Sequence, residues 1–234
     1  MKKIKLLHMF PRLLSLYGEY GSLALLTDLL EKAGYQVERT AYEGGELSLE
    51  ADLIYVGAGT EDNLLEAAAR LQPYAQAIRE SIEAGTLWLA TGNAMTLFGK
   101  EISRKDRVTP GVAAFDYTTT LDDSRRFLGD ALTQDTPATL GFVNTSCLYH
   151  GVESPWFTLK LGAQLGNDKK TPAEGIRAGS FHGTQLLGPL LTKNPHLLQY
   201  FYEKLTGEAL ELPEEDHLQK AYHLSSTELS HRGI

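Results

Sequence analysis

Residues 89–99 read LATGNAMTLFG, an apolar run followed by a tight turn and a short helical pattern. A strand that passes through such a turn into a helix has the outline of a turn that presents a nucleophile. Its centre is Thr91, Gly92 and Asn93, so neither a cysteine nor a serine stands there. The stretch predicts the end of a central strand and the start of a helix, and it leaves open what the turn is for.

The chain before this turn alternates between strand and helix patterns. Strands are predicted over residues 3–9, 35–42, 51–56 and 86–90. Helices are predicted between them, over residues 21–33 with Gly34 as the C-cap, and over residues 63–84 with a dent near Pro73. This β-α-β-α-β order predicts an α/β fold with a mostly parallel central sheet and helices on both faces. Ligand sites in such sheets lie at the carboxyl ends of the strands.

After about residue 107 the pattern changes to shorter strands separated by Asp, Gly and Pro. These strands are predicted over residues 115–121, 126–134, 141–143 and 156–161, as a short antiparallel or mixed extension. A last helix of this domain is predicted from Pro195 to Leu205, before Gly207. We expect one domain over residues 1–206, followed by a polar tail over 207–234 that forms one exposed helix from Pro213 or stays partly disordered.

Composition excludes several classes of function. With 42% hydrophobic and 22% charged residues the chain is typical of a soluble globular protein, and its longest apolar runs are too short to cross a membrane. The basic start MKKIKLLHMFP lacks a cleavage site and predicts a first strand. Cys147 is the only cysteine, which excludes an internal disulfide and favours the cytoplasm. A net charge of −8 without a basic stripe argues against nucleic acid as a partner.

Five segments together resemble one known family. They are LLSLYGEYGSLALLTDLLEKAGYQVE (residues 13–38), DLIYVGAGTEDN (52–63), PGVAAFDYTT (110–119), LGFVNTS (140–146) and HGTQLLGPLLTKNPHL (182–197). In this order they resemble class I glutamine amidotransferases of the cobyric-acid-synthase type, and most of all glutaminase subunits of the lipid II isoglutaminyl synthase kind. The match spans roughly residues 3–205.

The resemblance implies a three-layer, flavodoxin-like amidotransferase fold and a defined chemistry. In that family a cysteine at a strand-to-helix elbow attacks the side-chain amide of glutamine, a histidine activates the thiol, and backbone N–H groups hold the oxyanion. The ammonia passes to a synthetase, which for the lipid II type is a Mur-ligase-like partner that acts on bacterial cell-wall precursors.

Transferred residue by residue, the family pattern gives an unexpected result. The elbow motif C-G-G-x-Q-x-L-G, aligned on Gly99, puts Gly92 at the position of the nucleophile. The motif G-T-Y-L-H-G-P-L-L lies on residues 183–191 and puts Leu187 at the position of the base. The motif G-F-E-N-H lies on residues 141–145 and also loses its acidic and imidazole groups. We therefore expect no catalytic residues in a chain that kept the fold and lost glutamine hydrolysis.

Four other residues carry groups that could take part in chemistry or shape the turn. Thr91 is a possible nucleophile without the family base, and His182 stands five residues before Leu187 and is a possible displaced base. Asn93 suits a turn residue with positive φ. Cys147 is expected to be a buried, inert thiol.

The turn at Gly57, Ala58 and Gly59 follows a strand and, by the resemblance, supplies part of the oxyanion hole; with Thr91 and Asn93 it forms the predicted ligand-binding set. The seven histidines are scattered and no P-loop is present, so we expect no metal, no cofactor and no use of ATP by this chain.

Three hypotheses for the function follow. The first is a non-catalytic scaffold or regulator that binds a Mur-ligase-like or other ATP-dependent synthetase subunit, with residues 197–202 and the acidic tail as candidate contacts, although that helix is as well suited to the core. The second is an enzyme that releases ammonia through Thr91 or His182. The third is a sensor that binds a glutamine-like small molecule without reaction.

Overall fold

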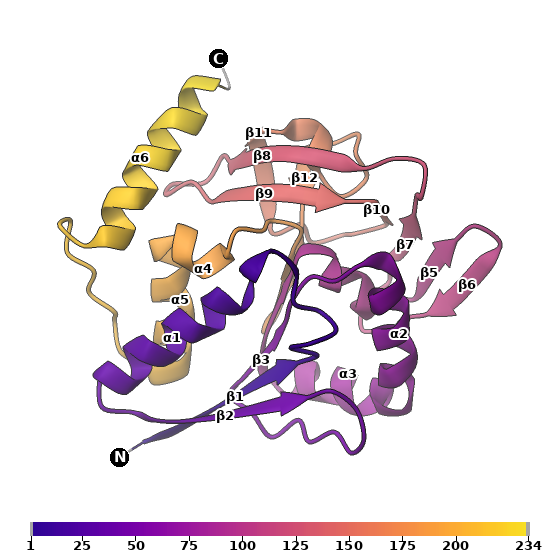
Figure 1. The fold of residues 1–234 in the computed structure, drawn as a ribbon, viewed down its shortest axis with the longest axis horizontal. Helices are drawn as coiled ribbons and strands as arrows, with labels where there is room; N and C mark the ends of the chain where they lie inside the picture. Colours follow the sequence, from indigo (N-terminus) through magenta and orange to yellow (C-terminus); the bar gives the residue numbers. More distant parts are fainter. Residues whose placement is uncertain (1, 233–234) are drawn as a thin grey trace.

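The computed structural model describes residues 2–232 and places a six-stranded sheet at the centre of the molecule, in the order β13-β14-β4-β3-β1-β2 (Figure 1). Its strands are β1 (Lys3–Met9), β2 (Gln36–Tyr42), β3 (Leu53–Val56), β4 (Leu87–Thr91), β13 (Ile176–Ala178) and β14 (Phe181–Thr184). All neighbours pair in parallel except β13 and β14. The predicted α/β class with a mostly parallel sheet is confirmed.

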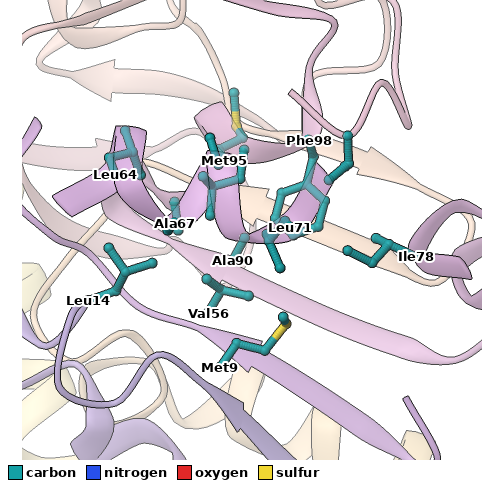
Figure 2. Close-up of a cluster of buried hydrophobic side chains, with 14 of the residues drawn as sticks. Met9, Leu14, Val56, Leu64, Ala67, Leu71, Ile78, Ala90, Met95 and Phe98 are labelled. Carbon is teal, nitrogen blue, oxygen red and sulfur yellow. The ribbon is translucent and has the colours of Figure 1, made fainter. Parts of the chain in front are cut away.

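Helices cover both faces of this sheet, because alternate side chains of each strand point to opposite sides. In β4, Trp88 and Ala90 belong to one buried cluster, whereas Leu87 and Leu89 belong to the other. The first cluster lies beneath α2 (Glu61–Leu71) and α3 (Ala75–Glu83), as Figure 2 shows for the side chains around Ala90. The second lies beneath α1 (Tyr20–Lys32), α4 (Leu190–Lys193) and α5 (Pro195–Thr206).

The helix predicted over residues 63–84 with a dent near Pro73 is divided into two α-helices in the structure. The α-helix ends at Leu71, a 3-10 turn η2 covers Gln72–Tyr74, and α3 begins at Ala75. Pro73 explains the break, since proline has no N–H to donate and its ring crowds the preceding turn.

The extension is larger than the short one predicted from the sequence. One four-stranded sheet, in the order β10-β7-β5-β6, contains β5 (Glu101–Arg104), β6 (Arg107–Pro110), β7 (Thr118–Leu121) and β10 (Cys147–His150). The other, in the order β12-β11-β8-β9, contains β8 (Phe127–Thr133), β9 (Leu140–Thr145), β11 (Phe157–Leu161) and β12 (Ala173–Glu174). The sequence pattern missed the β5–β6 hairpin, whose side chains are mostly polar or charged.

The end of the chain forms helix α6 (His217–Arg232), which begins four residues after Pro213. The hydroxyl of Tyr222 donates to the carbonyl of Ala138 at 2.8 Å, and Arg232 forms an ion pair with Asp130 at 2.9 Å. These contacts hold α6 against the extension (Figure 1). The division of the chain at residues 206 and 207 stays a prediction, and residues 233 and 234 lie outside the described range.

The apolar segment 197–202, a candidate partner contact in the sequence, belongs to the core instead. Leu197, Leu198, Phe201 and Tyr202 are buried against the sheet and its neighbours. Within residues 2–232 no helix combines the length and the apolar character needed to span a membrane. The cytoplasmic location stays a prediction.

Candidate functional site

Strand β4 runs into the 3-10 helix η3 (Gly92–Phe98) through the turn quoted at the outset. Gly92 has a φ of 64°, a conformation that side chains other than glycine rarely adopt. Asn93, expected to take the positive φ of this turn, does not have it. The positive φ of the turn is therefore at Gly92, directly after the end of β4 and one residue earlier than predicted.

Leu187 lies directly over Gly92. A Cβ atom built on Gly92 would be 2.7 Å from Leu187 Cδ2 and 2.7 Å from Ala58 Cβ, both far inside normal contact distance. The main chain of Leu187 is fixed by two hydrogen bonds with Phe142 of β9, at 3.1 and 2.9 Å. The two positions that the resemblance assigned to nucleophile and base are thus adjacent, and an apolar contact fills the space between them.

The segments that follow η3 hold it in place through close backbone contacts. Lys100 and Val112 donate backbone N–H groups to Tyr117 and Leu97, each at 2.9 Å. A Cβ on Gly111 would lie 2.1 Å from the carbonyl oxygen of Gly99. Gly111 is therefore needed for packing, whether or not the chain is catalytic.

The turn at Gly57, Ala58 and Gly59 is joined to the elbow by Asn93. Asn93 Oδ1 accepts the N–H of Gly59 at 3.0 Å, and Asn93 Nδ2 donates to the carbonyl of Gly59 at 2.7 Å. Leu14 covers the other side, since a Cβ on Gly59 would lie 2.4 Å from Leu14 Cδ2. Within the turn that the resemblance assigns to an oxyanion hole, the N–H of Gly59 already has an internal acceptor.

The predicted ligand-binding residues Gly57, Ala58, Gly59, Thr91 and Asn93 come together at the carboxyl ends of β3 and β4, and all five are buried. The structure thus brings the predicted set to one place and covers it with protein atoms. Ligand binding there stays a prediction.

Thr91 points to the face of the sheet covered by α1. Its hydroxyl lies 2.9 Å from that of Tyr55, and the Thr91 side chain is fully buried. Glu19, at the start of α1, is also fully buried, and its carboxylate accepts the backbone N–H of Gly188. Burial raises the pKa of Glu19 to about 7, although hydrogen bonds from Gly188 and Thr91 act in the opposite direction.

Sequence reasoning missed Glu19, which stands in the resembling segment between Gly18 and Gly21. A carboxylate just before a helix is typical of an ordinary helix start, so the local pattern gave no sign of its burial. One of its partners, Gly188, belongs to the loop after β14 and lies 169 residues away along the chain.

His182 does not approach Thr91. In the parallel register of β14 and β4, Thr184 is the residue opposite Thr91. The ring of His182 lies between Ser180 O, 3.1 Å from Nδ1, and the Tyr200 hydroxyl, 3.0 Å from Nε2. Burial, and then the charge of Arg177, lower the pKa of His182 to about 4. The displaced-base hypothesis therefore lacks the required contact.

Cys147 is buried, as expected, and lies beside the helix of the elbow. The hydroxyl of Thr96, in η3, lies 3.5 Å from the Cys147 sulfur. Burial raises the pKa of this thiol. The thiol form of a buried cysteine is a poor nucleophile, because the thiolate is the reactive species.

A second buried polar cluster, unpredicted, secures the loop after β14. Glu174 accepts hydrogen bonds from the Thr184 hydroxyl at 2.7 Å and from the N–H of Gln185 at 2.6 Å. Lys169 Nζ donates to Gln185 Oε1 at 2.6 Å. Burial raises the pKa of Glu174 to about 7 and lowers that of Lys169 to about 8. Across residues 2–232, no group of three or more His, Cys, Asp and Glu side chains is placed to hold a metal ion.

Comparisons with known proteins support the fold described above. No family model matches the chain. The lipid II isoglutaminyl synthase (glutamine-hydrolyzing) subunit GatD of Staphylococcus aureus (strain N315) is 27% identical over 213 residues, which cover 87% of this chain and 85% of GatD. A crystal structure of a glutamine amidotransferase, 16% identical, superposes with a TM-score of 0.55 over 86% of this chain and 99% of its own. The chain therefore has a glutamine-amidotransferase-like fold and a distant relative of that kind.

Replacement of Gly92 by alanine tests the contact with Leu187. Gly179 has a similar φ of 58° but open space around its Cα, so Gly179→Ala is a matched control for backbone strain alone. We expect Gly92→Ala to lower the free energy of unfolding by about 1–3 kcal/mol more than Gly179→Ala, because the new methyl group overlaps Leu187 and Ala58. Urea denaturation measures both. Equal losses in the two variants would show that Leu187 does not fill the elbow.

The buried carboxyl of Glu19 predicts a pH dependence of stability. Its pKa is about 7 in the folded chain and 4.5 ordinarily, so between these values the folded state holds a proton that the unfolded state has released. The stability of the wild type relative to Glu19→Gln should therefore fall as pH rises from about 4.5 to about 7, by on the order of 3 kcal/mol. Urea denaturation across this range gives the difference, and a difference that stays constant with pH would contradict the prediction.

Proposed function

We propose that this chain is a non-catalytic glutamine amidotransferase-like protein, which acts as a scaffold or regulator for a synthetase partner. The contact between Leu187 and Gly92 carries the proposal. Hydrolysis of an amide through a thioester needs a nucleophile and a base. The side chain of Gly92 is a hydrogen atom and that of Leu187 is an isobutyl group, so neither residue can act as nucleophile or base.

The nearby reactive groups support the same function. A route through Thr91 would need Glu19 as its base, and although Thr91 donates a hydrogen bond to Glu19, both side chains are fully buried. His182 is engaged with Ser180 and Tyr200 on the side of α5. No described contact brings these groups to a surface that a substrate can reach.

The state of the oxyanion turn is a further support. The amide of Asn93 satisfies both the N–H and the carbonyl of Gly59, so a substrate would have to displace an internal pair of hydrogen bonds. A glutamine sensor at the same turn would meet the same obstacle. The arrangement favours a role in which the elbow maintains the shape of the molecule.

A partner is suggested by the relative and by the surface. The relative in Staphylococcus aureus is named as a subunit of a synthase. In this chain Leu16, Tyr17 and Tyr20 are 36, 43 and 57% exposed, on the segment that continues from Leu14 over the turn of Gly57. Clustered exposed apolar side chains mark interaction surfaces. We infer that these three side chains, in place of residues 197–202, contact a Mur-ligase-like or other ATP-dependent synthetase subunit.

Glutamine hydrolysis is the direct test of the non-catalytic state. The purified chain, alone and with a synthetase subunit, is incubated with glutamine, and ammonia is measured by a coupled assay. We expect no release above that of buffer, because Gly92 and Leu187 hold the positions that the resemblance assigns to the nucleophile and the base. Turnover that Thr91→Ala, His182→Ala or Cys147→Ala abolishes would overturn the proposal and identify the group responsible.

Partner binding is tested with a Mur-ligase-like subunit from the same organism. We expect a complex on size-exclusion chromatography, and we expect the joint replacement of Leu16, Tyr17 and Tyr20 by serine to weaken it by about 100-fold, since buried aromatic anchors dominate interfaces. Serine at Val108 and Leu128, which are 62 and 59% exposed elsewhere, serves as the control. A chain that stays monomeric with every synthetase subunit tried contradicts the scaffold role.

A further inference from the structure

A pocket of about 600 Å³ lies at the opposite end of the sheet from the elbow. Its lining includes Asp52, Thr86 and His182, which stand at the amino ends of β3, β4 and β14, and it is completed by Arg177 of β13 and Lys204 of α5. The elbow follows the carboxyl end of β4, and a five-residue strand is about 16 Å long. The pocket is therefore separate from the site described above.

Two cations line this pocket beside the same aromatic ring. The guanidinium carbon of Arg177 lies 5.2 Å from the centre of the Tyr200 ring, and Lys204 Nζ lies 5.5 Å from it. In the described part of the chain neither cation forms an ion pair with a carboxylate. The lining has one carboxylate, Asp52, which accepts the N–H of Lys5 at 2.7 Å. The pocket therefore has an excess of positive charge in a chain whose net charge is −8.

A chain of hydrogen bonds fixes the position of Arg177. Because the Ser180 carbonyl can only accept, His182 Nδ1 carries the proton and donates to it at 3.1 Å. The unprotonated Nε2 then accepts the Tyr200 hydroxyl at 3.0 Å, which leaves the tyrosine oxygen free to accept Arg177 Nη2 at 3.1 Å. The buried, neutral imidazole thus anchors Tyr200, and Tyr200 orients the guanidinium.

We propose that this pocket binds a small metabolite through an oxyanion group, a phosphate or a carboxylate, held between Arg177 and Lys204. Guanidinium and ammonium groups form charge-assisted hydrogen bonds with such anions, and arginine matches them with a planar fork of donors. Pockets for small molecules usually measure about 300–1,000 Å³, so there is room for the rest of a small ligand. The proposal is independent of the elbow and of the scaffold role.

The test is an NMR titration of the full chain with inorganic phosphate, and separately with succinate, at constant ionic strength. We expect saturable shifts of the backbone amides of Thr86, Gly179 and Ser180, which line the pocket. Arg177→Gln and Lys204→Gln should each weaken binding by about tenfold or more, because each removes a charged hydrogen-bond donor. The controls are Arg107→Gln and Lys160→Gln, which remove exposed cations that are not in the pocket lining.

A phosphate-bearing ligand is supported if phosphate binds saturably, binds more weakly to the two pocket variants, and binds to the two control variants as it does to the wild type. A carboxylate-bearing ligand is supported if succinate alone gives this result. If neither anion saturates the amide shifts by about 50 mM, or if the pocket variants bind as the wild type does, the proposal is wrong. Well-dispersed spectra of the variants show that a loss of binding is not a loss of folding.

Discussion

The contact of Leu187 with Gly92 is the constraint on which the centre of this molecule depends. The elbow has room only for a hydrogen atom at residue 92, because Leu187 Cδ2 and Ala58 Cβ already occupy the position of a side chain. A positive φ there also favours glycine. Leu187 in turn is held by β9, so the parallel sheet and the extension meet at this contact. An amidotransferase-like fold has here an apolar junction where the resemblance places the nucleophile and the base.

The surrounding polar groups complete this junction. Asn93 joins the elbow to Gly59, and Glu19 joins the start of α1 to the loop after β14. Buried polar groups are costly unless they are hydrogen-bonded, so each of these pairs fixes the relative position of two loops. The carboxyl end of the sheet is thereby closed, whereas its amino end keeps an open pocket with two cations that have no carboxylate partner in the described chain. The two ends of one sheet suit different roles.

Much of the fold was accessible from local patterns, and the errors have physical causes. Buried parallel strands form apolar runs, so β1, β3 and β4 were placed to within a few residues. The interruption near Pro73 was also placed, although as a dent and not as a full break, and the start of α6 was placed four residues too early. Asn93 was assigned the positive φ because asparagine tolerates it, but its amide is needed to bridge to Gly59. An apolar face over residues 197–202 suits both a partner contact and a core helix, and only the packing shows that this face is internal.

The sequence by itself determined the alternation of strands and helices, the elbow after β4, and the residue types at Gly92 and Leu187, because these follow from periodicity and identity along the chain. Tertiary structure alone decided that Leu187 fills the space beside Gly92, that His182 turns toward Tyr200, and that Arg177 and Lys204 share a pocket. Each of these facts joins residues from different elements. Burial, pKa shifts and shared cavities depend on such distances in space, which separation along the chain does not fix.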